Sequence, residues 1–220
     1  MKIAISGSGG IGKTTLGRAL AERLHLPFLE ENLEPLVRAG AELHRRKQSA
    51  AASADVAASE SNYLAAVDAW LADRQHQQDS HPDGFVADRC ALDILQRWLL
   101  GGRSEDDAKT AALIRHVQAQ ADRLDLVIVP PMLRLRDETD NEAGLRRISA
   151  LGPRLLSHAL YCGLLEQLTQ VPRLYLAARP TTVEQRVEQV LSTIERLNRA
   201  CGSALPDAAQ PARTNRQETP

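Results

Sequence analysis

The chain has 220 residues, of which 43% are hydrophobic, and this length and apolar content suit one domain with a sizeable core. The 27 basic and 28 acidic residues leave a formal net charge of -1, which disfavours nucleic acids and anionic membranes as partners because no global field attracts polyanions. The three cysteines are widely spaced, and no apolar run approaches the length of a membrane span. Together these features predict a cytoplasmic protein.

Short apolar runs bounded by turn residues predict five strands, and the longer stretches between them predict helices. Strands that alternate with helices indicate an α/β fold, in which a mostly parallel sheet is covered on both faces. The strands are expected at residues 2–6, 27–30, 84–88, 124–129 and 173–178, and the helices at 13–25, 33–80 in pieces, 91–121, 143–169 and 182–199.

Two regions are less regular. The segment 39–58 is rich in Ala and Ser, and its sequence is compatible with either a helix or a mobile connector. From Cys201 onward the chain has few large apolar residues and three prolines, which predicts a disordered tail over 201–220. Residues 1–200 are then expected to form the single folded domain.

The stretch "GSGGIGKTT" at residues 7–15 follows the first predicted strand and opens the first predicted helix. It satisfies the P-loop pattern G-x-x-x-x-G-K-[ST], in which backbone N–H groups and the positive end of the helix dipole bind phosphate. The alternative is a glycine-rich turn with no ligand. The nucleotide-binding residues are expected to be Gly7, Gly9, Gly10, Ile11, Gly12, Lys13, Thr14 and Thr15.

Within this loop, the side chains of three consecutive residues have separate predicted roles. Lys13 is expected to reach the β- and γ-phosphates, the Thr14 hydroxyl to bind Mg²⁺, and Thr15 to add a phosphate contact. An acid at the carboxyl end of a neighbouring strand can hold the same metal through water, and Asp88 in "GFVADRCALD" stands at that place. Arg89 is expected to bind the acceptor. The alternative for Asp88 is a cap on the helix that begins near Cys90.

The P-loop, together with this acid-Arg pair after the third strand, resembles the P-loop nucleoside and nucleotide kinases. Within that group the chain is most similar to the nicotinamide riboside kinase-like and deoxynucleoside kinase-like members, over residues 1–199 in element order. The resemblance implies a three-layer α/β/α P-loop NTPase fold with a five-stranded parallel sheet in the order 2-3-1-4-5, and it implies ATP and Mg²⁺ as cofactors.

The resemblance also implies roles for residues in three loops. Glu31 or Glu30, in "LEENLEP", is expected to accept the proton of the attacking hydroxyl group. The segment 131–147 is expected to form a lid in which Arg134 and Arg136 close over the phosphates, with help from Arg146 or Arg147, although interleaved acids are equally compatible with a solvated loop. Arg179 is expected near the adenine.

Two local patterns in the predicted helices have structural interpretations. Tyr63 and Trp70 are seven residues apart and share a helix face, which favours core packing over stacking on a bound base. Thr181 and Glu184 have the spacing of a capping box.

We therefore predict a magnesium-dependent kinase that transfers the γ-phosphoryl group of ATP to a nucleoside, a nucleotide or a similar small molecule. The catalytic residues are expected to be Lys13, Asp88, Glu31, Arg89, Arg134 and Arg136, and the metal is expected on Thr14 and Asp88. The alternative function is an ATPase or nucleotide-binding switch that acts through a protein partner. A homodimer is possible, and the sequence leaves the identity of the acceptor open.

Overall fold

The computed structural model describes residues 1–49, 52–101, 107–132, 151–179 and 182–202. Their strands form one five-stranded sheet in the order β2-β3-β1-β4-β5, and every neighbouring pair is parallel, which confirms the predicted fold class and strand order. The strands are β1 (Lys2–Ile5), β2 (Phe28–Leu29), β3 (Phe85–Asp88), β4 (Leu126–Val129) and β5 (Arg173–Tyr175).

Helices follow the strands in the predicted alternation. They are α1 (Lys13–Leu24), α2 (Glu34–Gln48), α3 (Ser53–Asp79), α4 (Ala91–Leu100), α5 (Asp107–Ala121), α6 (Leu151–Leu168) and α7 (Val183–Gly202). The single helix expected over 91–121 is instead two, because α4 ends at a C-cap glycine, Gly101. Most of the segment 39–58 is helical, belonging to α2 and α3, and α7 extends two residues into the predicted tail.

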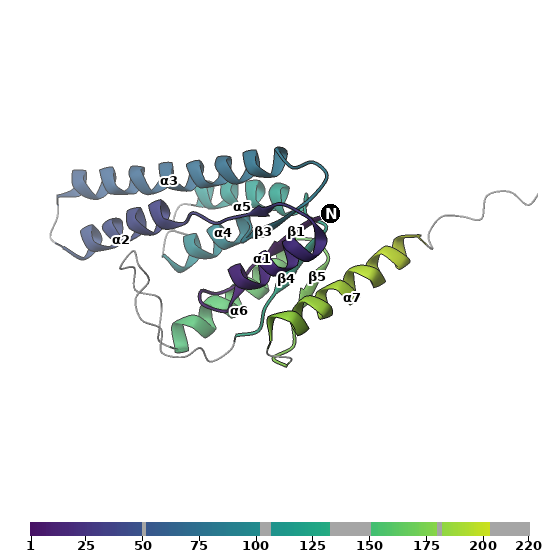
Figure 1. Ribbon diagram of the computed structural model, residues 1–220. Coiled ribbons are helices and arrows are strands. Elements are labelled where there is room, and N and C mark those ends of the chain that lie inside the picture. The colour runs from purple at the N-terminus through teal and green to yellow at the C-terminus, as the bar shows by residue number, and fades with distance from the viewer. Residues whose placement is uncertain (50–51, 102–106, 133–150, 180–181, 203–220) are drawn as a thin grey trace, which may run out of the picture.

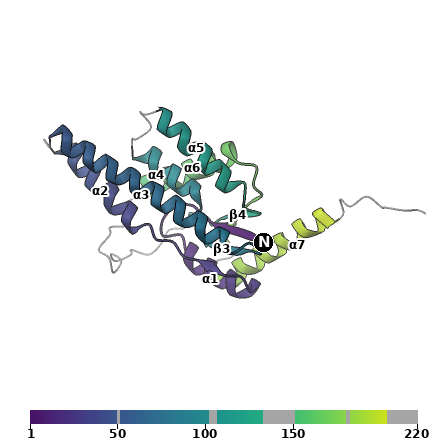
Figure 2. The same ribbon diagram turned by 90° about the horizontal axis from the view of Figure 1, so that it is seen from above.

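The sheet separates two apolar clusters, and the alternation of side chains along β1 shows why. Ile3 and Ile5 are fully buried against residues of α1 and α7, whereas Ala4 between them belongs to the larger cluster with α2 to α6. Figures 1 and 2 show the resulting three layers, with α1 and α7 on one side of the sheet and α3, α4 and α5 on the other. Both faces of a parallel sheet are covered, as its apolar strands require.

The predicted aromatic face of α3 belongs to the core. Tyr63 and Trp70 are 2% and 7% exposed, which confirms core packing, and the Tyr63 ring stacks on Trp98 of α4 with centroids 6.3 Å apart. The cap of α7 is placed one residue later than expected: the backbone N–H of Gln185 donates to the Thr182 hydroxyl at 3.3 Å. Thr181 lies outside the described residues.

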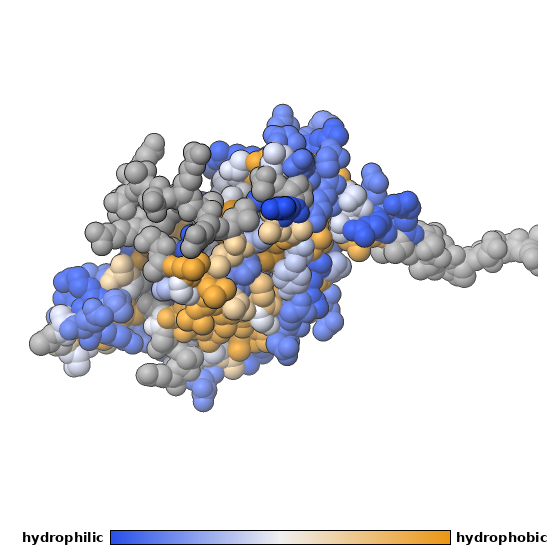
Figure 3. All heavy atoms as spheres, turned by 90° about the horizontal axis from the view of Figure 1, so that it is seen from below, coloured by the Kyte–Doolittle hydropathy of each residue, from blue (hydrophilic) through white to orange (hydrophobic). Residues whose placement is uncertain are grey.

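The outer face of α6 is unusually apolar for a surface helix. Leu151, Leu155 and Leu156 are each more than half exposed, and the view from below shows apolar side chains gathered on this face (Figure 3). In the described part of the chain no helix is long and apolar enough to cross a lipid bilayer.

Candidate active site

The predicted P-loop connects β1 to α1 with the geometry of an anion cradle. Gly7 and Gly12 have φ angles of 121° and 82°, in the region that side-chain-bearing residues rarely adopt. Gly12 is also the N-cap of α1, so the unpaired N–H groups of the first helical turn face the loop. Ile11, which is 1% exposed, anchors the loop in the core. The path of the backbone through the loop therefore requires glycine at these two positions.

Lys13 lies folded against the loop it belongs to. Its Nζ donates to the Ser8 carbonyl oxygen at 2.7 Å, and the residue is only 5% exposed. Burial, together with the nearby charge of Arg89, lowers the pKa of Lys13 to about 8, against the opposing effect of Asp93, Asp88 and Glu31. A bound phosphate would supply the anion that this buried ammonium group lacks.

Asp88 and Thr14 meet at the carboxyl ends of two adjacent strands. The Thr14 hydroxyl donates to Asp88 Oδ2, and Asp88 Oδ1 is buried with no hydrogen-bond partner among the described residues. Asp88 does not cap α4, because the backbone N–H of Cys90 is instead bonded to Asp93 Oδ2 at 3.1 Å. A hydroxyl beside a carboxylate with a free oxygen fits the few protein ligands that Mg²⁺ takes when phosphates complete its shell.

Among the described residues, no larger cluster of potential metal ligands competes with this pair. The described residues contain no group of three or more His, Cys, Asp or Glu side chains placed to hold a metal ion. A metal here would therefore depend on oxygens from a bound nucleotide, as expected for Mg²⁺.

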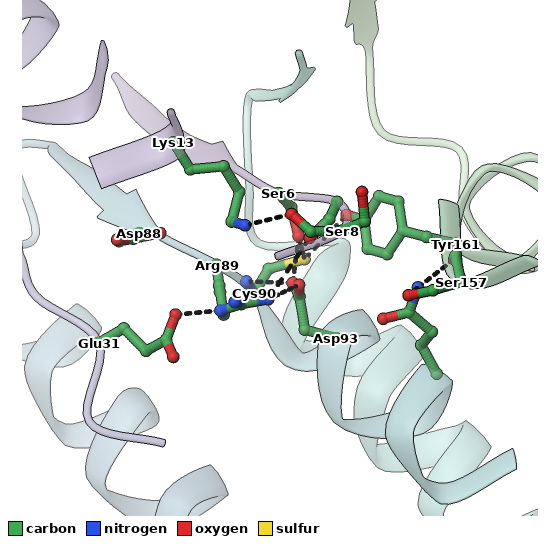
Figure 4. A network of polar contacts seen from close by, with 12 residues as sticks. Ser6, Ser8, Lys13, Glu31, Asp88, Arg89, Cys90, Asp93, Ser157 and Tyr161 are labelled. Carbon is green, nitrogen blue, oxygen red and sulfur yellow. Dashed lines mark hydrogen bonds and ion pairs between the residues drawn. The ribbon is translucent and has the colours of Figure 1, made fainter. Parts of the chain in front are cut away.

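Arg89 links the end of β3 to two carboxylates. Its backbone adopts a positive φ of 73°, and its guanidinium group contacts Glu31 and donates to Asp93 Oδ1 at 2.9 Å (Figure 4). Burial opposes the charge of Arg89, but the facing carboxylates of Glu31, Asp93 and Asp88 together raise its pKa above the ordinary value. The left-handed backbone turns the side chain toward the P-loop, where it also lies 3.4 Å from the Gly7 carbonyl oxygen.

Glu30 and Glu31 have opposite environments. Glu30 forms an exposed ion pair with Arg18 at 2.5 Å, and its side chain is 65% exposed. The Glu31 side chain is 18% exposed and contacts Arg89. Burial raises the pKa of Glu31, although the Arg89 charge opposes the shift. Of the two candidates, Glu31 faces the site and Glu30 faces solvent, so we retain Glu31 as the proposed base.

Three polar residues of this network are absent from the sequence-based prediction. Asp93 accepts hydrogen bonds from Arg89, from Cys90 N and from the Ser6 hydroxyl, and it is fully buried. Its spacing of four residues from Arg89 in "DRCALD" is the signal that would have predicted the pair. Ser6 is the residue that follows β1.

The third missed residue, Arg74, is buried on α3 under the site. Its guanidinium group donates to three backbone carbonyls, those of Leu29, Glu30 and Asp88, at 3.0 to 3.4 Å, and it lies 5.2 Å from the centroid of the Trp70 ring. Burial lowers the pKa of Arg74, and Glu31 opposes the shift. Arg74 thus ties the ends of β2 and β3 together, and no local sequence pattern indicates this role.

Several predicted site residues lie either outside the described residues or on the exposed surface. Arg134, Arg136, Arg146 and Arg147 lie outside the described residues, as does most of the predicted lid. Arg179 is exposed in the loop before α7, and no contact of its side chain is described. Thr15 is exposed on the first turn of α1. The expectations for these side chains remain predictions.

Comparison with known proteins places this geometry in a family. A protein-family model with the description "AAA domain" matches residues 2–186 of the chain. The chain belongs to the AAA domain family. Among curated proteins, no sequence is significantly similar to it.

Solved structures share the fold of this AAA domain protein. Deoxyadenosine kinase from M. mycoides with bound dATP has a TM-score of 0.57 and 16% identity, covering 89% of this chain and 99% of that chain. Thymidylate kinase from Candida albicans has a TM-score of 0.55 and 15% identity, covering 89% and 91%. The predicted resemblance to P-loop nucleoside and nucleotide kinases is thereby confirmed at the level of the fold.

Proposed function

We propose that this AAA domain protein is a magnesium-dependent kinase that transfers the γ-phosphoryl group of ATP to a small hydroxyl compound. The observation that carries the proposal is that two carboxylates in different environments lie beside the P-loop. Asp88 is paired with the Thr14 hydroxyl, whereas Glu31 is held by Arg89 and has a raised pKa. A metal-binding acid and a separate general base are what hydroxyl phosphorylation requires.

The proposed reaction divides the work between the two carboxylates. The acceptor oxygen attacks the γ-phosphorus, the bond from that phosphorus to the β–γ bridging oxygen breaks, and ADP leaves with the electron pair. The hydroxyl proton passes to Glu31, whose raised pKa brings it closer to neutral pH. Lys13 and the loop N–H groups bind the phosphates, and Arg89 holds Glu31 in place. Positioning and charge neutralisation supply most of the acceleration.

Mg²⁺ would be held by Thr14 and Asp88, and when bound it neutralises charge on the β- and γ-phosphates. The contact between these two side chains keeps both oxygens at one point of the site. Asp88 is 3% exposed, so its unpaired oxygen is not satisfied by bulk water.

The structural relatives support the class of ligand. The deoxyadenosine kinase of similar fold was solved with dATP bound, and a second structure of it with the products dCMP and dCDP. Kinases that act on nucleosides and nucleotides therefore share this arrangement of strands and helices, which favours a small acceptor of that kind over a protein acceptor.

The experiment is a calorimetric titration with ATP, with and without Mg²⁺, followed by ATP-consumption assays with nucleosides, nicotinamide riboside and nucleoside monophosphates. The proposal predicts uptake of ATP that Mg²⁺ strengthens and ATP consumption that depends on an acceptor. An Asp88→Asn variant should lose most of the effect of Mg²⁺. Absence of ATP binding at millimolar concentration, or slow hydrolysis that no small acceptor stimulates, would contradict the proposal, and the second result would favour a switch.

A further inference from the structure

One arginine next to the proposed base is not paired within the described chain. Arg97 lies on α4, one helical turn beyond Asp93, so the two residues share a face of the helix. It is half-buried, yet its guanidinium group has no hydrogen-bond or ion-pair partner in the part of the chain that the structure describes. Asp93 is not available to it, because the Asp93 oxygens already accept from Ser6, Arg89 and the Cys90 N–H.

The other buried cations around the site are compensated. Arg89 contacts Glu31 and Asp93, Arg74 donates to backbone carbonyls and stacks on an indole ring, and Lys13 donates to the Ser8 carbonyl. Within the described part of the chain, Arg97 is the exception. Removing a cation from water without a partner is unfavourable, and buried cations in proteins are paired for this reason.

Arg97 interacts electrostatically with the charged residues of the site, including the proposed base Glu31. Burial lowers the pKa of Arg97 and the charge of Arg89 lowers it further, while Glu31 and Asp93 act in the opposite direction. A simpler role for Arg97 is to complement the carboxyl-terminal dipole of α4, since it lies in the last turn. That role suits an exposed side chain and does not account for half-burial beside another arginine.

We propose that Arg97 binds an anionic group of the phosphoryl acceptor, at the end away from the reacting hydroxyl. This inference rests on the proposed kinase function and extends it by naming the class of acceptor: a hydroxyl compound that carries a carboxylate or a phosphate. The reacting hydroxyl group lies at Glu31, because Glu31 is the proposed base and must accept the hydroxyl proton. The anion lies farther along α4, past Asp93, where Arg97 supplies a planar guanidinium group that suits either anion.

The test compares acceptors in matched pairs that differ in an anionic group. Suitable pairs are nicotinic acid riboside with nicotinamide riboside, orotidine with uridine, and deoxycytidine 3′-phosphate with deoxycytidine, so that both carboxylates and a phosphate are represented. Binding of each compound is measured by calorimetry and kcat/KM by ATP consumption, with nucleoside 5′-monophosphates as a further arm. ATP affinity is measured separately for every variant, which shows whether the P-loop is intact.

For at least one pair, the anionic member should bind and react about 10- to 100-fold better, as a charge-assisted contact implies. Arg97→Ala should remove that preference while changing the neutral member little, and Arg97→Lys should retain part of it. Arg115→Ala, which removes an exposed arginine from α5, is the matched control and should leave the preference unchanged. Comparison of the carboxylate pairs with the phosphate pair shows which of the two anions Arg97 binds.

Three results would overturn the inference. The first is the absence of any preference for the anionic members, including failure of both members of every pair to bind. The second is an equal loss for both members in Arg97→Ala, which indicates a structural role. The third is transfer only to the phosphate of nucleoside 5′-monophosphates. If ATP binds and neutral acceptors react equally well, only this inference fails, whereas absence of ATP binding removes the proposed function itself.

Discussion

The donor side and the acceptor side of the candidate site are built in different ways. The donor side consists of residues 7–15 and Asp88, and most of its binding groups are backbone N–H groups of consecutive residues. The proposed acceptor side consists of Glu31, Arg89 and Asp93, which ion pairs through Arg89 hold together, and of Arg97, which has no such partner in the described part of the chain. One side is fixed by the path of the chain, and the other is held by ion pairs.

This difference has consequences for how each side tolerates change. A backbone cradle keeps its shape when a side chain is truncated, so substitutions on the donor side should affect ligand binding more than stability. On the acceptor side, removal of one partner leaves another charge buried, and such losses destabilise a fold by about 3–5 kcal/mol when burial is complete. Activity and stability should therefore separate on the donor side and move together on the acceptor side.

The largest expected effect is on the donor side. Lys13→Ala should lower kcat by about 10³-fold, because it removes the positive charge that stabilises the phosphoryl group during transfer. The melting temperature should change little or rise, since burial already disfavours the Lys13 charge in the folded protein. Steady-state kinetics and thermal unfolding measure the two quantities. Lys47→Ala, on the exposed face of α2, is the control. Near-normal turnover in Lys13→Ala would show that the loop does not bind the donor.

The second effect tests whether activity and stability are coupled on the acceptor side. Glu31→Gln should lower kcat by about 10²-fold through loss of the general base, with little change in ATP affinity. It should also destabilise the fold, because it removes one of the two ion pairs that Arg89 forms with described residues. Urea unfolding measures this loss. A variant that loses activity but keeps full stability would mean that the Glu31–Arg89 contact contributes nothing to folding.

How far the sequence predicts the site follows the same division. The P-loop was predictable because its spacing, strand and helix are contiguous, and Asp88 because it ends a strand next to β1. Arg74 was not predictable, since it lies within a 27-residue helix and contacts the site through backbone carbonyl groups. Every residue has a carbonyl group, so such contacts give no sequence pattern. The choice between Glu30 and Glu31 also required the structure, because the direction of each side chain depends on the two-residue strand β2.

The strand order was predictable from the family resemblance together with five apolar runs. Helix boundaries were less so. The stretch 91–121 is divided because α4 ends at Gly101, and the glycines and polar residues of "GGRSEDD" at 101–107 are the sequence signal for that break. Packing between helices, such as that of the Tyr63 ring on Trp98, then helps to set the orientation of α4, which carries Asp93.

A third, smaller effect is a pH dependence specific to the donor side. In the free protein the pKa of Lys13 is lowered to about 8, and bound phosphate should raise it again. Between these two pKa values, ATP binding takes up a proton, so affinity falls as pH rises. We expect about a tenfold loss of ATP affinity from pH 7.5 to pH 9. Calorimetry in buffers with different ionisation enthalpies measures both the affinity and the proton uptake.

Two other titratable groups near the loop are not expected to contribute to this pH dependence. Burial raises the pKa of Cys90 to about 11, and the pKa of His158 is lowered by burial and by the Lys13 charge, so neither is expected to titrate between pH 7.5 and 9. The loss of affinity should disappear in Lys13→Ala. ATP affinity that stays constant up to pH 9 would mean that Lys13 keeps its proton in the free protein.

The smallest expected effect decides between neighbouring glutamates. Glu30→Gln should change kcat less than about twofold and the free energy of unfolding by less than about 1 kcal/mol, since exposed ion pairs such as that with Arg18 contribute little. The substitution is chemically identical to Glu31→Gln and one residue away, so it controls for local disturbance of the loop after β2. A large loss of kcat in Glu30→Gln with an active Glu31→Gln would transfer the base to Glu30. Because Glu30 is exposed and paired with α1, that result would require the loop to rearrange when the acceptor binds, and the acceptor side would then be assembled by its ligand.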